Sequence, residues 1–403
     1  MIPNQKRIQV KSYDSSGTFI KIIPDVEVTG FKKTINGGLG LFTFRVDRGI
    51  NDFNTDEDIT LGNKIEVKVF DIDNNTEGVF LYSGFIVDEN IEYEDKREFV
   101  SVSCVGNYSK LSQDVLKTGS QTTLYTTATG LTVTSGSQAS GEVSVIAKAI
   151  IDSYNNNTEN SLINYETDDT PSVTPTTNIM QYTFEAKTFF DAIDKCREYG
   201  PQNTYWYIDA ENVFHFKQKP ITATHKFTFG KDIKSIRVNK NIFSLKNVLL
   251  LWGTDKVGAD VAYKEYKDDT SIGLYGRRIE QSTELNVEDE ASMDNVGNSY
   301  INENKDPIVT IEVEVADNNG VSGTDGFSGY DIESIEVGDT CKIENVADNG
   351  LFGENMTIIE VNWTKDAVII EIEAKVKNVS KILASMSKAV DSKDLVGIPT
   401  IYS

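Results

Sequence analysis

Four apolar segments separated by turn residues occupy the run from Leu39 to Tyr108, and this pattern constrains the fold more than any other feature of the sequence. In three of the segments apolar and polar residues alternate, with the apolar positions at Phe42, Phe44 and Val46, at Ile65, Val67 and Val69, and at Val100, Val102 and Cys104. Successive side chains of a strand point to opposite faces of a sheet, so each segment predicts a strand with one buried face. The more continuously apolar run from Val79 to Val87 predicts the fourth strand.

Turn-forming residues separate these strands at Gly37–Gly38, Leu61–Asn63 and Asp73–Asn75. Gly, Asn and Asp tolerate positive φ or hydrogen-bond their own backbone, as a tight connection requires. Short strands joined in this way indicate a β-barrel or a β-sandwich. Such a scaffold does not name a function by itself.

The balance of charge excludes one class of partner. The chain has 403 residues, of which 39 are basic and 62 acidic, and its net charge is −23. A surface of that sign repels phosphate, so we do not expect nucleic-acid binding through a broad basic face. Two interpretations remain: an ordinary solvated surface, and a surface past which DNA or another polyanion moves without adhering.

The cysteines and the hydropathy of the chain bear on its compartment. Cys104, Cys196 and Cys341 lie far apart in apolar-patterned segments and predict buried free thiols, made in a reducing cytoplasm. The first seven residues are not followed by an apolar stretch, and nowhere do 18 apolar residues follow one another. We therefore expect neither a signal peptide nor a membrane span.

The middle of the chain changes from a strand pattern to a helix pattern. Residues 117–141 are mostly small and polar, typical of either a long exposed loop or a short two-stranded excursion. Helical spacing then predicts a helix over Glu142–Tyr154, which Asn155–Asn157 ends, and a polar connecting loop follows over Asn160–Thr177.

A second helix and a hairpin complete this region. The hydroxyl of Thr188 can cap the helix while Asp191 imitates the acidic partner of a capping box, and Gly200–Pro201 ends it. Two aromatic-rich segments, 205–208 and 213–216, flank Asp209–Asn212 and predict a β-hairpin with a four-residue loop.

The remaining sequence returns to strands. Further strands are predicted at 225–229, 233–238, 247–252, 308–315, 339–344, 356–363 and 367–376. A third helix is predicted over Val287–Asn302, with Asn286 as its cap, and another helical face begins at Val379.

These segments give a mainly β fold with an α+β insertion. The length supports two to four domains. We expect a first β-barrel domain over residues 1–116, an α+β insertion domain over 117–222, a second β-barrel domain with a helical insertion over 223–376, and a C-terminal helix and tail over 377–403.

The sequence offers few candidates for catalysis, and we predict no catalytic, cofactor-binding or metal-binding residues. The histidines, His215 and His225, both lie in strand patterns, without zinc spacing or a nucleophile elbow. Asp71–Thr76 begins like a calcium loop but lacks the required glycine, so a hairpin turn is the better interpretation. Gly37–Gly40 precedes a strand, which leaves no helix dipole for phosphate.

Carbohydrate chemistry stays open as an alternative. Paired carboxylates for glycoside hydrolysis are available among the 62 acidic residues, and only their spatial separation would identify a pair. Tyr205, Trp206 and Tyr207 could stack on a sugar, although aromatic residues clustered in a hairpin more often pack in a core.

Four short motifs, in this order of elements, resemble the hub or tail-tip proteins of tailed bacteriophages. They are Gly40–Val46, Gly62–Val67, Tyr82–Ile86 and Ile335–Ile343. In that family a Gly-Asp or Gly-Asn turn followed by an alternating strand recurs in the barrel domains, and a helix-plus-hairpin insertion separates them. The resemblance spans most of the chain.

The resemblance implies a structural protein of the virion tail tip, synthesised in the host cytoplasm and without enzymatic activity. It implies a homotrimer in which two tube-like barrels per subunit form a pseudo-sixfold ring that closes or extends the tail tube. The implied partners are a distal tail or tail-tube protein, a tape measure protein and a central fibre or spike, with DNA passing through the lumen without specific binding. The alternative is a carbohydrate-binding or glycan-cleaving host-attachment protein.

Overall fold

A computed structural model describes most of the strands and helices of the chain. The described residues are 6–48, 57–71, 79–94, 97–116, 124–125, 138–157, 163–166, 172–175, 179–184, 187–201, 204–220, 222–254, 261–284, 290–316, 330, 332–346, 356–364 and 368–374. They form two compact units, Met1–Lys219 with Ile359–Ile369, and Pro220–Ile358 with Ile370–Ser403.

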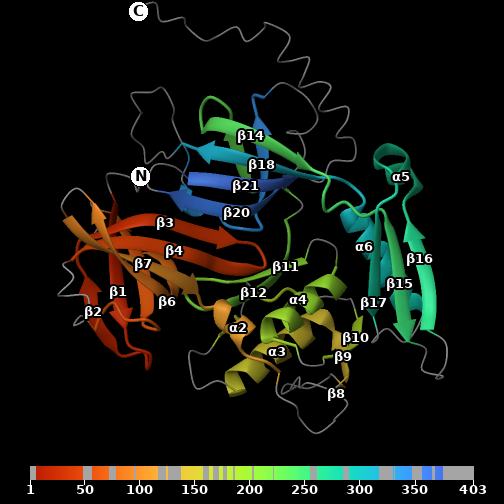
Figure 1. The fold of residues 1–403 in the computed structure, drawn as a ribbon, viewed down its shortest axis with the longest axis horizontal. Helices are drawn as coiled ribbons and strands as arrows, with labels where there is room; N and C mark the ends of the chain where they lie inside the picture. The colour runs from red at the N-terminus through yellow and green to blue at the C-terminus, as the bar shows by residue number, and fades with distance from the viewer. Residues whose placement is uncertain are drawn as a thin grey trace, which may run out of the picture. The chain divides into compact units, whose positions relative to one another are not determined.

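An antiparallel sheet organises the first unit (Figure 1). Its strands are β1 (Lys6–Tyr13), β2 (Phe19–Ile23), β3 (Val26–Thr34), β4 (Gly37–Asp47), β5 (Lys64–Asp71), β6 (Val79–Glu94) and β7 (Arg97–Gly106). They lie in the order β2, β1, β5, β6, β7, β4, β3. Residues Glu360–Thr364 of β20 (Met356–Thr364) pair with β3.

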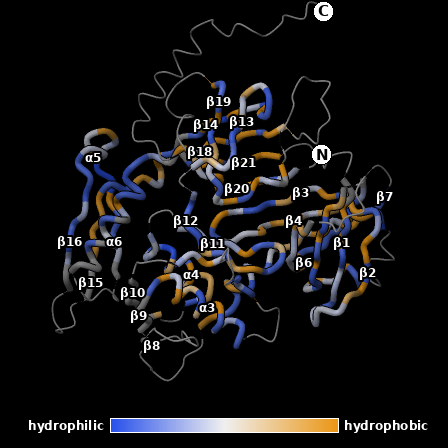
Figure 2. Tube along the Cα trace, turned by 180° about the vertical axis from the view of Figure 1, so that it is seen from behind, coloured by the Kyte–Doolittle hydropathy of each residue, from blue (hydrophilic) through white to orange (hydrophobic). Residues whose placement is uncertain are grey.

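Apolar and polar residues alternate along these strands, and the apolar ones form the core of the sheet. This alternation of hydropathy is visible along the chain in Figure 2. Phe42, Phe44 and Tyr82 are fully buried, and the rings of Phe42 and Tyr82 stack with centroids 4.9 Å apart. The intervening residues Thr43 and Arg45 lie on the opposite face. The four strands predicted between Leu39 and Tyr108 are confirmed.

Three helices, a three-stranded sheet and a β-hairpin make up the rest of the described part of the first unit. They are α2 (Ser109–Gln113), α3 (Val143–Asn157), α4 (Phe189–Tyr199), β8 (Leu124–Tyr125), β9 (Gln138–Glu142), β10 (Ile179–Thr183), β11 (Thr204–Ile208) and β12 (Phe214–Gln218). Helix α4 begins as predicted, because the Asp191 backbone N–H donates to the Thr188 hydroxyl at 3.0 Å. In the hairpin, Ile208 pairs with Phe214.

This part joins the large sheet where β11 runs parallel to β4. Ile208 lies beside Gly38, which has a φ of 109°, and a Cβ at Gly38 would collide with the Ile208 backbone. Glycine is therefore required there for close approach of two backbones. The turn itself lies at Ile35–Asn36, and the two glycines predicted to form it are the first residues of β4.

The second unit contains two groups of strands. Strand β14 (Ile233–Asn241) pairs with β18 (Ile308–Val315), and β13 (His225–Thr228) pairs in parallel with β19 (Thr340–Glu344); β21 (Val368–Ala374) follows β18 in the sheet order. A separate sheet has the order β16 (Val261–Lys267), β15 (Val248–Thr254), β17 (Ile279–Glu284). Helix α6 (Glu290–Asn304) packs against β15, and α5 (Asp269–Tyr275) follows β16.

The predicted mainly β fold with an α+β insertion is confirmed. Among the described residues the pairings do not close on themselves, so the two barrels and the finer domain boundaries stay predictions. One expectation needs correction: α3 continues through Asn155–Asn157 instead of ending there, and Asn155 hydrogen-bonds to Ile163. The described residues of 117–141 contribute β8 and β9 to a sheet with β10, which agrees with the second of the two interpretations, a two-stranded excursion. The Asp71–Thr76 turn after Asp71, the cap at Asn286 and the helix from Val379 lie outside the described residues.

Candidate functional site

The first unit has a sheet with one apolar and one polar face. Phe44, Val46, Val100 and Val102 are buried on one face. The residues between them, which include Thr43, Arg45, Ser101 and Ser103, are half-buried on the other. Arg45 of β4 reaches across β7 to Glu92 of β6, with 2.6 Å between guanidinium and carboxylate. We call this surface the first polar face.

The second unit repeats this division. Val309, Ile311, Val313, Ile370 and Ile372 are buried, while the residues between them lie on the opposite side. That side presents Thr310, Glu312, Glu314, Glu371 and Glu373 from β18 and β21, together with Ser235 and Arg237 from β14. Arg237 donates to Glu312 at 3.0 Å and the Ser235 hydroxyl to Glu314 at 3.1 Å. Four carboxylates and one guanidinium make this second polar face acidic.

Each unit also contains the same turn. In Thr60–Asn63 and in Glu336–Asp339, the backbone N–H of the fourth residue donates to the carbonyl of the first, at 3.0 and 3.3 Å. The third residue is glycine, Gly62 or Gly338, and both have a φ of 88°. Positive φ at that position is what glycine supplies without strain.

The two turns make the same bonds to a neighbouring strand. Gly62 N–H donates to the Ile86 carbonyl at 2.9 Å, and Ile86 N–H donates back to Asn63 at 3.0 Å. In the second unit Gly338 N–H donates to Ile358 at 2.8 Å, and Ile358 N–H donates back to Asp339 at 2.9 Å. The same backbone construction therefore begins β5 in one unit and β19 in the other.

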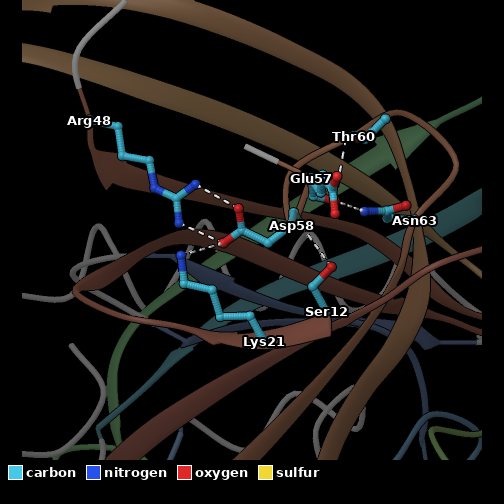
Figure 3. Close-up of polar contacts among 7 residues, drawn as sticks. All are labelled: Ser12, Lys21, Arg48, Glu57, Asp58, Thr60 and Asn63. Atoms are coloured by element: carbon cyan, nitrogen blue, oxygen red, sulfur yellow. Dashed lines mark hydrogen bonds and ion pairs between the residues drawn. The ribbon is translucent and has the colours of Figure 1, made fainter. Parts of the chain in front are cut away.

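A buried ion-pair cluster lies beside the first turn (Figure 3). Asp58 is 3% exposed and accepts two bonds from the guanidinium of Arg48, at 2.9 and 2.7 Å. Lys21 adds a longer contact at 3.6 Å. Burial alone would raise the pKa of Asp58, but the hydrogen bonds and charge of Arg48 and the charge of Lys21 outweigh it, so the pKa lies below its usual value.

The backbone around Asp58 is held by its neighbours. The Ser12 hydroxyl of β1 donates to the Asp58 carbonyl at 2.6 Å, and the Asn63 side-chain amide donates to the Glu57 carbonyl at 2.7 Å. The cluster thus fixes the segment that precedes the turn against β1 and β2. The cluster lies beside the turn, and its charged groups contact one another, so it indicates a structural role.

A histidine cluster lies beside the second turn. One ring nitrogen of His225, Nε2, lies 2.8 Å from the Asp339 carboxylate, and the other, Nδ1, lies 2.9 Å from the Tyr330 hydroxyl. The side chain is buried and stacks on Phe227. Both nitrogens of His225 are therefore engaged in contacts that hold β13 beside the Gly338 turn.

The other residues considered for chemistry are packed in cores. His215 lies in a strand, as predicted; it bonds through Nε2 to Asp209 at 2.7 Å, and its Nδ1 is buried without a partner. Trp206 is fully buried against Phe190 and Phe214. All three cysteines are buried free thiols, and burial raises the pKa of each one, that of Cys341 to about 12.

Comparison with known proteins gives these features a context. Residues 221–385 match the family model described as prophage endopeptidase tail. The chain also superposes along nearly its whole length on the tail protein gp18 of a Listeria monocytogenes prophage, with a TM-score of 0.52, 12% identity and coverage of 95% of this chain and 99% of the other.

The chain has the fold of a phage tail protein. Two further tail-protein structures support the match, both with a TM-score of 0.56. They are the 43 kDa tail protein of prophage MuSo2 from Shewanella oneidensis, at 13% identity with coverage of 92% and 98%, and the tail protein of Neisseria meningitidis, at 11% with coverage of 93% and 98%. The resemblance to tail-tip and baseplate proteins is confirmed, although no curated protein sequence matches.

No helix in the described part of the chain is long and apolar enough to cross a membrane. No group of three or more His, Cys, Asp or Glu side chains among the described residues is arranged to hold a metal ion.

Sequence reasoning identified the turns but not the clusters beside them. Gly62–Asn63 and Gly338–Asp339 are visible as motifs, whereas the partners of Asp58 and Asp339 lie 10 and 114 residues away from them in the sequence.

Proposed function

We propose that this chain is a structural tail-tip hub of a bacteriophage, and that three copies form a ring that closes or extends the tail tube. The observation that carries the proposal is the repeated turn and strand, with the same three backbone bonds around Gly62 and around Gly338. The turn and strand at Gly62 and those at Gly338 define two equivalent modules in one chain, and a trimer then has six modules. A threefold ring can in this way present a sixfold surface to a tube.

The proposed channel wall consists of the two polar faces. The second polar face carries Glu312, Glu314, Glu371 and Glu373 against Arg237, and the net charge of the chain is −23. Such a wall repels phosphate and lets DNA pass without binding it. The apolar faces stay in the cores of the modules.

The place of the proposed ring defines its partners. It would contact a distal tail or tail-tube protein on one side and a central fibre or spike on the other, with the tape measure protein within reach of the channel. The location in the virion is the tail tip. The support is the tail-protein fold together with the family match over residues 221–385.

The family description names an endopeptidase, but we propose that this chain cleaves no peptide. Both ring nitrogens of His225 are occupied by Asp339 and Tyr330, and His215 is tied to Asp209. The thiols of Cys104, Cys196 and Cys341 are buried, and their raised pKa values keep them protonated at neutral pH. Cleavage of a peptide substrate that is lost in His225→Ala would contradict this part of the proposal.

The glycan-binding alternative required Trp206 and Tyr205 to be accessible for stacking on a sugar. Trp206 is fully buried and Tyr205 nearly so, since both pack in the core of the α+β part. We therefore rank the structural function first.

Electron microscopy of the purified chain tests the proposed function. The expected class averages show rings with threefold symmetry, six lobes and a central channel. Monomers at micromolar and higher concentrations, with binding of the chain to a glycan array, would contradict it and favour the alternative.

A further inference from the structure

One half of β6 has an edge to which no described strand is paired. Residues Val79–Phe85 pair with β5, and Ile86 bonds to Asn63. From Val87 to Glu94, β6 pairs only with β7 among the described residues, so its other edge offers free backbone N–H and C=O groups. Natural proteins rarely leave such an edge uncovered unless it is used.

This edge is strongly acidic. The segment Val87–Glu94 has the sequence VDENIEYE, with four acidic residues and no basic one. Val87 and Tyr93 are 47% and 65% exposed, large fractions for apolar and aromatic side chains. We call Val87–Glu94 the acidic edge.

One carboxylate of the acidic edge lacks a partner. Glu89 lies opposite Val102, on the apolar side of the sheet, and its Oε2 is buried without a hydrogen bond. Burial and the charge of Asp88 raise the pKa of Glu89. A buried carboxylate oxygen without a donor is costly, and a cation from outside the chain would offset that cost.

The second unit has an edge of the opposite charge. Strand β14 pairs only with β18 among the described residues. Its sequence, IKSIRVNKN, has three basic residues and no acidic one. Lys234 is exposed and Arg237 is 80% exposed. We call β14 the basic edge.

Other free edges do not show this complementarity. Strand β2 has a single charged residue, Lys21, which already contacts Asp58. Glu280 of β17 is paired with Lys246 at 2.8 Å. Of these described edges, the acidic edge has both an excess of negative charge and a carboxylate oxygen without a partner.

We infer that the basic edge β14 of one copy adds to the acidic edge Val87–Glu94 of a second copy, so that the sheet continues from subunit to subunit. Backbone bonds along the two edges supply the affinity, as in β-strand addition. The positive charges that Lys234, Arg237 and Lys240 bring to β14 attract the acidic edge, and two like edges repel each other. The inference rests on the proposed ring, because each copy must offer one edge to each neighbour.

A charge-reversal series tests the pairing. The chain with K234E, R237E and K240E has two acidic edges, and its trimer should dissociate at a concentration about tenfold or more above that of the wild type, measured by sedimentation velocity. Adding D88K, E89K and E94K to the same chain restores opposite edges and should restore the trimer. Circular dichroism confirms that each variant is folded.

A matched control separates edge pairing from net charge. K226E/K231E changes two exposed basic residues of the same unit outside β14 and should leave the trimer intact. A folded K234E/R237E/K240E chain that stays as trimeric as the wild type overturns the edge pairing and leaves the proposed ring standing. A wild-type chain that never assembles overturns both.

Discussion

Asp58 is a buried charged residue that is paired with an opposite charge. The residue is 3% exposed and its partner Arg48 is 9% exposed, so neither charge is solvated in the folded state. Removing one charge leaves the other buried and uncompensated. The replacement Asp58→Asn should lower the free energy of unfolding by about 3 kcal/mol at pH 7, measured by urea denaturation.

Asp269→Asn is the matched control for Asp58. Asp269 is 78% exposed and pairs with Lys267 at 3.1 Å, so its loss should cost less than about 1 kcal/mol. An equal effect of the two replacements would contradict the account of the cluster.

The cluster also predicts a pH dependence. The folded-state pKa of Asp58 lies below the value of about 3.9 in an unfolded chain. Its contribution to stability is therefore complete above about pH 4 and is lost as the pH falls through the folded-state pKa. The stability difference between wild type and Asp58→Asn should shrink below pH 4, and a constant difference down to pH 2 would contradict this assignment.

The thiols make a second residue-scale prediction. Cys104, Cys196 and Cys341 are at most 1% exposed, and burial raises their pKa values. Ellman's reagent should find no reactive thiol in the native protein at pH 8 and all three in denaturant. A thiol that reacts rapidly in the native protein would mean that its strand or helix opens.

At the scale of single elements, the repeated turn depends on its glycines. A Cβ at Gly62 would meet no atom within 4 Å, so the cost of Gly62→Ala is that of the positive φ alone, about 1 to 2 kcal/mol. Gly338 has the same φ of 88°, and Gly338→Ala should cost a similar amount. Thermal denaturation of both variants measures this.

Gly273 provides the control for the glycine series. It lies in α5, where a Cβ would also meet nothing within 4 Å and φ is not positive. Gly273→Ala should stabilise the protein by about 0.5 to 1 kcal/mol, because alanine is the better helix former. Destabilisation by Gly273→Ala and not by Gly62→Ala would contradict the role of the turn.

Most elements could be predicted because their patterns are local. Alternation identified β4, β5, β7 and β18, and the Thr188 cap identified the start of α4. Strand β15 was predicted, but its neighbours β16 and β17 and the helix α5 were missed, since Tyr263, Glu265 and Lys267 are exposed and β16 carries no clean alternation. Its register depends on pairing with β15, which no single segment encodes.

The candidate site could be predicted only in part. Glycine at the third position of each turn, Gly62 or Gly338, is typical of a residue with positive φ, so both turns could be predicted as motifs. The contacts of Asp58 with Arg48 and of Asp339 with His225 are set by the fold, as is the separation of polar from apolar faces across several strands.

At the scale of the whole molecule, charge governs the contact with DNA. The wild-type chain, with its net charge of −23, should not retard duplex DNA in a gel at moderate salt. Glu312→Lys with Glu314→Lys reverses two charges on the second polar face and should produce retardation that disappears with added salt. Retardation by the wild type at the same salt would contradict the proposed channel wall.

The orientation of the polar faces in the assembled ring is the central claim. A cryo-electron microscopy reconstruction of the purified chain tests it most directly, because it locates Arg45, Glu312 and Glu314 relative to the ring axis. We predict a threefold ring in which these residues line the channel and β14 of each copy lies beside Val87–Glu94 of the next. A ring with these residues on its outer surface, or a map of isolated monomers, would contradict the account.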